Sequence, residues 1–66
     1  MNDTRSLYLA EKRYMRLYGM TPRQAEIYAR ANRGWTINSI ANECAITRGA
    51  VMAHLRRARV KKMEMV

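Results

Sequence analysis

Residues 36–59, which read TINSIANECAITRGAVMAHLRRAR, decide the fold of this 66-residue chain. Two runs of apolar side chains recur there at helical spacing, and a short segment around Ala45 and Ile46 separates them. The runs consist of Ile37, Ile40, Ala41 and Cys44, and then of Val51, Leu55 and Ala58. Each run lies on one side of a helix. The stretch therefore predicts two helices, each with one buried side, joined by a tight turn.

Capping residues indicate where these two helices start. Thr36 or Asn38 can cap the first and Thr47 the second, because their side-chain oxygens accept hydrogen bonds from amides of the first turn. We expect the second helix to cover residues 47–62 and to leave its outer side free. A short helix, a tight turn and a longer helix with a free outer side are typical of a helix-turn-helix, whose second helix enters the major groove of DNA.

The N-terminal half of the chain predicts two further helices. The first covers residues 5–18, and Gly19 can end it because glycine readily adopts the left-handed backbone conformation. The second begins at Thr21-Pro22, with Thr21 as the cap and Pro22 in the first helical position, and extends to about Arg33. The side chains expected to face the core are Leu7, Tyr8, Ala10, Tyr14, Leu17 and Tyr18 of the first helix, and Ile27, Tyr28 and Ala31 of the second.

No part of the chain shows the alternating pattern of strands, an internal repeat or a linker rich in Gly, Ser or Pro. We therefore expect an all-α fold, a small four-helix domain over residues 1–66 whose helix-turn-helix core lies at residues 36–59.

Composition excludes several classes of protein. The only cysteine, Cys44, cannot form an internal disulfide, and a lone histidine, His54, makes neither a metal cluster nor a catalytic group. We therefore expect no enzymatic activity, no cofactor and no metal site. No stretch approaches the roughly 20 apolar residues that a bilayer span needs, so we expect a cytoplasmic protein without membrane contact.

Charge indicates the kind of partner. The chain has 13 Lys or Arg against 5 Asp or Glu, a formal net charge of +8, and no acidic residue occurs between Glu43 and Glu64. Double-stranded DNA is the expected partner, because a basic helix after a tight turn fits both its phosphates and its major groove. The residues expected to contact bases are Arg48, Met52, Ala53 and Arg56, and those expected to contact the DNA backbone are Thr36, Asn38, Thr47, Arg57, Arg59, Lys61 and Lys62.

A family resemblance points the same way. The segments MTPRQ (20–24), GWTIN (34–38), IANE (40–43), ITRGAV (46–51) and HL (54–55) resemble, without gaps, the DNA-binding domain of the LuxR/GerE family. The resemblance implies a tetrahelical fold in which Met52, Ala53 and Arg56 contact bases. The chain departs from the family at Ala50, where a phosphate-binding Thr is common, and at Ala45, where the turn usually has Gly.

The resulting expectation is a sequence-specific transcription regulator, either a repressor or an activator, that binds as a homodimer through the helix at residues 5–18. Removing Lys61 is expected to flatten the salt dependence of binding by about one unit. The end of the last helix, residues 54–61, also resembles sigma factor region 4. The alternative is therefore a region 4-like or adaptor protein whose main partner is RNA polymerase or another regulator. RNA binding is a third possibility.

Overall fold

Four α-helices make up the secondary structure of residues 3–64, the part of the chain that the computed structural model describes. They are α1 (Asp3–Tyr18), α2 (Pro22–Asn32), α3 (Ile37–Cys44) and α4 (Arg48–Glu64). No strand occurs among these residues, so the predicted all-α class is confirmed. The first two and last two positions of the predicted 1–66 domain lie outside the described residues.

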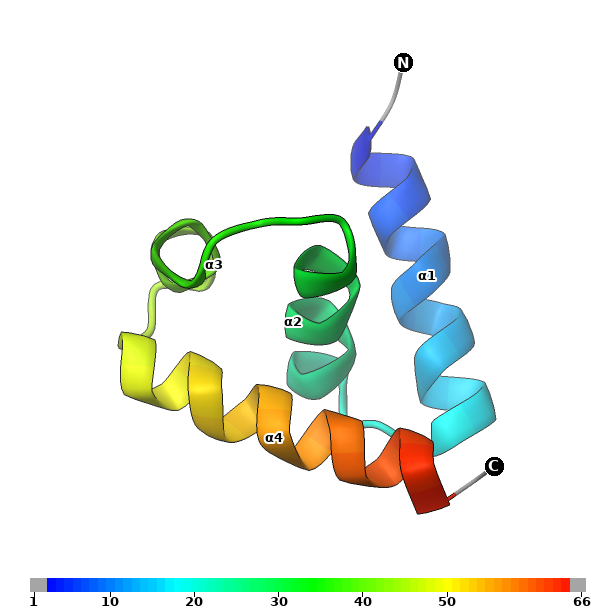
Figure 1. Cartoon of the computed structure of the whole chain (residues 1–66). Helices are drawn as coiled ribbons and strands as arrows, with labels where there is room; N and C mark the ends of the chain where they lie inside the picture. Colours follow the sequence, from blue (N-terminus) through cyan, green and yellow to red (C-terminus); the bar gives the residue numbers. More distant parts are fainter. Residues whose placement is uncertain (1–2, 65–66) are drawn as a thin grey trace.

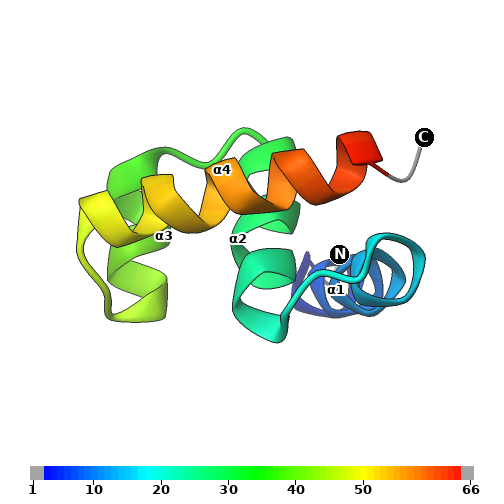
Figure 2. The same cartoon turned by 90° about the horizontal axis from the view of Figure 1, so that it is seen from below.

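Helix α2 occupies the centre of the arrangement. Figure 1 shows α1 on one side of α2 and α3 on the other, with α4 running across the lower side of the molecule. Seen from below in Figure 2, α4 lies in front of both α2 and α3. Contacts join α2 to each of the other three helices, and α4 also packs against α3. One side of α4 is therefore held by two helices, and its opposite side is left uncovered.

The predicted signals at the ends of α1 and α2 are present. Gln24 N donates to Thr21 Oγ1 over 3.2 Å, and Thr21 N donates to Gln24 Oε1 over 3.1 Å, which completes a capping box before Pro22. Gly19 follows α1 with a φ of 68°, and Gly34 follows α2 with a φ of 87°. Both glycines thus adopt the left-handed conformation that ends a helix.

The short connection between α3 and α4 is closed by capping interactions at both ends. Thr36, not Asn38, caps α3, because its Oγ1 accepts from Ser39 N over 3.1 Å. Thr47 caps α4 in the same way through Ala50 N, also over 3.1 Å. Ala45 ends α3 in the left-handed conformation, with φ 56° and ψ 43°.

Ala45→Gly is expected to stabilise the fold by about 0.5–1 kcal/mol. A left-handed conformation disfavours alanine by about 1–2 kcal/mol, and the greater freedom of glycine in the unfolded chain offsets part of that gain. The free energy of unfolding in urea measures the change. Ala53→Gly within α4 is the matched control, and it should destabilise the protein by about 1 kcal/mol. A loss of stability in Ala45→Gly would contradict a strained turn.

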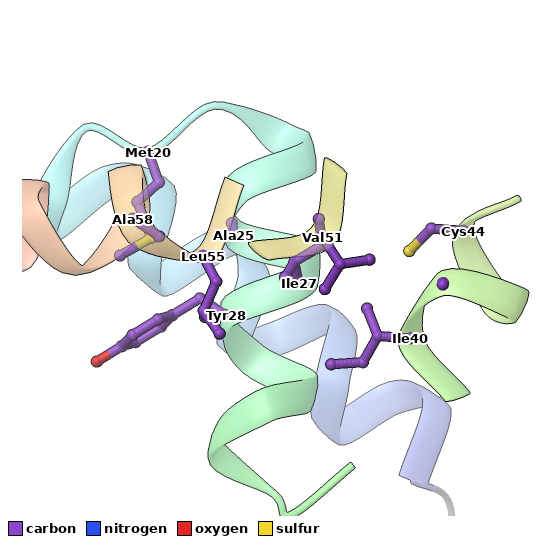
Figure 3. Packing of buried hydrophobic residues seen from close by; sticks show 10 residues of the cluster. Met20, Ala25, Ile27, Tyr28, Ile40, Cys44, Val51, Leu55 and Ala58 are labelled. Atoms are coloured by element: carbon purple, nitrogen blue, oxygen red, sulfur yellow. The ribbon is translucent and has the colours of Figure 1, made fainter. Parts of the chain in front are cut away.

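The core lies where α2, α3 and α4 meet. Ile27, Ile40 and Val51, one from each helix, are fully buried, and Figure 3 shows Val51 between the other two. Leu55 and Ala58 continue the buried side of α4 toward Tyr28 and Met20 of the neighbouring segments. The predicted inner sides of α3 and α4 are confirmed, because Ile40, Ala41, Cys44, Val51, Leu55 and Ala58 are all buried and Ile37 is partly buried against them.

The predicted inner side of α1 is partly wrong. Leu7 is buried, and Tyr14 and Tyr18 pack against the core, but Tyr8 is 54% exposed and Leu17 is 48% exposed. Successive residues of a helix are about 100° apart, so a helix that buries Leu7, Tyr14 and Tyr18 turns Tyr8 and Leu17 to its sides. The Tyr8 ring instead lies beneath the Lys12 ammonium, 5.2 Å from the ring centre.

Candidate nucleic-acid interface

The uncovered side of α4 is a long exposed surface that the helix packing leaves. We call it the α4 outer face, and it consists of Gly49, Met52, Ala53, Arg56, Val60 and Met63. These residues lie around the helix away from Val51, Leu55 and Ala58, which are buried. Of the four side chains predicted to contact bases, Met52, Ala53 and Arg56 lie on this side, with Ala53 half-buried and the other two exposed. Arg48 is exposed at the first position of α4, but it is seven residues before Leu55 and so has nearly the direction of the buried side.

Met63 belongs to this face although the sequence prediction left it out. The predicted helix ended at about residue 62, whereas α4 extends to Glu64, and Met63 is 75% exposed. The absence of Gly or Pro after Lys62 is the signal that could have extended the prediction.

The arginines of α4 have no acidic partner. Within residues 3–64, Arg48, Arg56, Arg57 and Arg59 form no ion pair or hydrogen bond with another side chain. The arginines of α2 differ, because Arg23 pairs with Glu26 over 3.0 Å and Arg30 with Glu11 over 2.9 Å. Helix α4 thus carries four arginines whose positive charge is not balanced by a neighbouring acidic side chain.

Two of these arginines lie on opposite flanks of the outer face. Arg57 and Arg59 are two positions apart, which turns their side chains about 200° from each other around the helix, and both are exposed. Arg56 lies between these directions, on the outer face itself. Arg56 is therefore the central arginine, and Arg57 and Arg59 flank it.

The two lysines at the end of α4 face the rest of the protein instead. Lys61 Nζ donates to the Gly19 carbonyl oxygen over 3.0 Å. Lys62 Nζ lies 5.9 Å from the centre of the Tyr28 ring, and the Tyr28 side chain raises the pKa of Lys62, first through hydrogen bonding. Both charges therefore stabilise the contact between the end of α4 and the α1–α2 region. In the sequence these two lysines belong to the same basic run as the arginines. A run of charges does not show which of its members have a partner within the fold.

Helix α3 crosses α4. Figure 2 shows the beginning of α3 on one side of α4 and the end of α3 on the other side. Thr36, Asn38 and Thr47, the uncharged residues predicted to contact the DNA backbone, are all exposed. The Thr36 hydroxyl accepts from Ser39 N and donates to Ser39 Oγ, whereas the Thr47 hydroxyl accepts from Ala50 N and keeps its hydrogen as a donor. Backbone amides of the first turn are further donors at these helix starts.

The remaining reactive side chains are a buried cysteine and a half-buried histidine. Cys44 is buried, and burial, followed by the charge of Glu26, raises the pKa of its thiol. His54 is half-buried, and its Nδ1 is enclosed without a hydrogen-bond partner among the described residues. No group of His, Cys, Asp or Glu in residues 3–64 is arranged to hold a metal ion. The helices of this segment also lack the combined length and apolar character that crossing a membrane requires.

Comparisons with known proteins provide no relative: no protein-family model, no curated protein and no solved structure matches the chain.

Proposed function

We propose that this protein is a sequence-specific transcription regulator that binds double-stranded DNA and reads the major groove with the α4 outer face. The observation that carries the proposal is the set of exposed arginines without acidic partners, with Arg56 on that face and Arg57 and Arg59 on its flanks. A second observation supports the proposal: a short connection at residues 45–47 joins α3 to α4, and α4 has a free outer side, as the second helix of a helix-turn-helix must have. A tetrahelical fold of the LuxR/GerE kind is part of the same proposal.

Three side chains of the α4 outer face supply the base contacts. Arg56 donates two parallel hydrogen bonds to O6 and N7 of a guanine, the geometry that a guanidinium fits best. Met52 is 49% exposed and carries no polar hydrogen, so it offers an apolar contact, such as one to a thymine methyl group. Ala53 leaves room for the helix to approach. Arg48 begins the helix and reaches the edge of the same groove.

Contacts to phosphates fix the position of α4 in the groove. Arg57 and Arg59 are exposed on its two flanks, and the exposed helix starts at residues 36–38 and 47–48 supply first-turn amides that can donate to phosphates. Lys61 and Lys62 add long-range attraction, but their amines are already held by Gly19 and Tyr28. The arginines on the flanks therefore contribute the larger part of the phosphate binding.

Arg57→Ala is expected to weaken binding to all duplex sequences alike and to flatten the slope of log K against log salt by about one unit. Lys61→Ala should change this slope less, because its amine is bonded to the Gly19 carbonyl oxygen. Fluorescence anisotropy on one labelled duplex, over a salt series, measures both variants. An equal or larger change of slope in Lys61→Ala would return that lysine to the interface.

Competition between nucleic acids tests whether double-stranded DNA is the preferred partner. At about 0.15 M salt, duplex DNA should compete for the protein more strongly than single-stranded DNA or an RNA hairpin of equal length. Stronger competition by RNA would favour RNA recognition.

Homodimer formation and a cytoplasmic location remain predictions. Sedimentation of the protein with and without DNA tests homodimer formation.

A further inference from the structure

A second exposed face combines positive charge with large apolar side chains. It lies on α1 and consists of Leu9, Arg13, Arg16 and Leu17, which we call the α1 outer face. These positions are spaced i, i+4, i+7 and i+8, so they form one continuous strip along the helix. Both figures of the whole chain show α1 on the side of α2 that faces away from α3.

The strip is open and has no partner within the fold. Leu9 is 54% exposed and Leu17 is 48% exposed, while Arg13 and Arg16 are exposed and form no ion pair with any residue of the described segment. The one acidic side chain described on α1, Glu11, is turned inward to Arg30 over 2.9 Å. Two leucines surrounding two unpaired guanidinium groups make a face that can bury apolar area and bind carboxylates at the same time.

A second copy of this chain is a poor occupant. When two α1 helices pair antiparallel so that Leu9 meets Leu17 of the partner's α1, Arg13 comes opposite its own copy. A parallel pair also places Arg13 against Arg13. Two like charges about 4 Å apart repel by about 1 kcal/mol even in bulk water, and by more at an interface. The face is therefore better suited to a surface of opposite charge than to the homodimer contact expected of residues 5–18.

The two leucines of the α1 outer face help to choose among the possible anionic partners. Phosphates of nucleic acid bind arginines but leave Leu9 and Leu17 without apolar contact. Insertion into a membrane surface needs an apolar side separate from the charged one, whereas here the two kinds of side chain share one side and the opposite side is packed on α2. A helix with an apolar stripe flanked by Asp or Glu satisfies both the leucines and the arginines.

We propose that the α1 outer face is a docking surface for an acidic amphipathic helix of a second protein. The leucines pack on the apolar stripe of that helix, and Arg13 and Arg16 pair with its carboxylates. The surface is separate from the α4 outer face, so the protein can hold such a partner while α4 is engaged elsewhere. The proposal goes beyond DNA binding and does not depend on it.

The test uses a fluorescein-labelled synthetic peptide of about 18 residues with leucines at helical spacing flanked by Glu. The double variant Arg13→Glu/Arg16→Glu and the uncharged double variant Leu9→Ser/Leu17→Ser should each weaken its binding at least tenfold, about 1.4 kcal/mol or more. The matched control is Arg56→Glu/Arg57→Glu, which makes the same charge change on α4 and should weaken binding less than threefold. Circular dichroism checks that each variant remains folded.

Each outcome of this test has a meaning. Equal losses in the α1 and α4 variants would overturn the proposal, since only net charge would then matter. A peptide with Gln in place of its leucines that binds as well as the original would do the same. Sedimentation that shows a dimer lost in Leu9→Ser/Leu17→Ser would assign the face to a second copy. A larger effect of Arg13→Glu/Arg16→Glu on duplex DNA than on the peptide would assign it to nucleic acid.

Discussion

Arg56→Ala is expected to weaken binding to a selected duplex by about 1–3 kcal/mol, which is about a 5- to 150-fold loss of affinity. Arg56 is exposed at the middle of the α4 outer face and has no acidic partner in residues 3–64, so no ion pair has to break before its guanidinium binds a base. Truncation removes two hydrogen bonds and leaves the guanine acceptors unpaired. The preference of the protein for guanine at that base pair should weaken as well.

Two further variants separate reading a base from attracting a phosphate. Arg56→Lys keeps the charge but not the paired donors, so it should recover less than half of the lost free energy on the selected duplex. Arg57→Ala should lower binding to selected and random duplexes by the same factor. Titrations of both duplexes by anisotropy supply the comparison. Equal losses on the two duplexes in Arg56→Ala would remove this residue from base recognition.

Ile40→Ala is expected to destabilise the fold by about 2–5 kcal/mol. Ile40 is fully buried and packs with Ile27 and Val51 where three helices meet. A chain of this length has a total stability of about 3–10 kcal/mol, so the substitution removes a large fraction of it. Because α3 is only eight residues long and depends on this packing, its position beside α4 should be lost first.

The single tryptophan reports this change. Trp35 packs against the core just before α3, with the Arg30 guanidinium 5.4 Å from its ring centre, so its fluorescence follows the opening of that region. Urea titrations of the wild type and the variant give the two free energies of unfolding. Met52→Ala is the control, since Met52 is 49% exposed and should change stability by less than about 0.5 kcal/mol. Similar losses in both variants would contradict the central role of the Ile40 contact.

Local signals predicted α2, α3 and α4 well. Thr21 with Pro22, Thr36 and Thr47 are capping signals that operate within one turn, and the turn residue Ala45 is left-handed as the position required. The buried side of α3 follows a helical period with one apolar direction, and the buried side of α4 follows the spacing of Val51, Leu55 and Ala58 although its outer face also carries apolar side chains. Such features depend on neighbours in sequence, so a single chain is enough to find them.

Features that depend on distant contacts could not be predicted in the same way. Leucines and tyrosines occur on most sides of α1, so the pattern did not show that Tyr8 and Leu17 are exposed. The partner of Lys61 is the carbonyl of Gly19, which is 42 positions earlier in the chain. The arginines of α4 could be placed on an exposed side from the register of Val51 and Leu55, because their direction follows from the buried side of the same helix.

Selection of binding sites from a random duplex pool, at about 0.15 M salt, tests most directly whether the α4 outer face reads DNA. The wild type and Arg56→Ala are selected in parallel. We expect an enriched motif for the wild type, and the same motif with one guanine position degenerate for Arg56→Ala. A dimer would give two half-sites about 10 bp apart. No enriched motif for the wild type, with binding that disappears as salt rises, would show that the α4 outer face does not read DNA sequence.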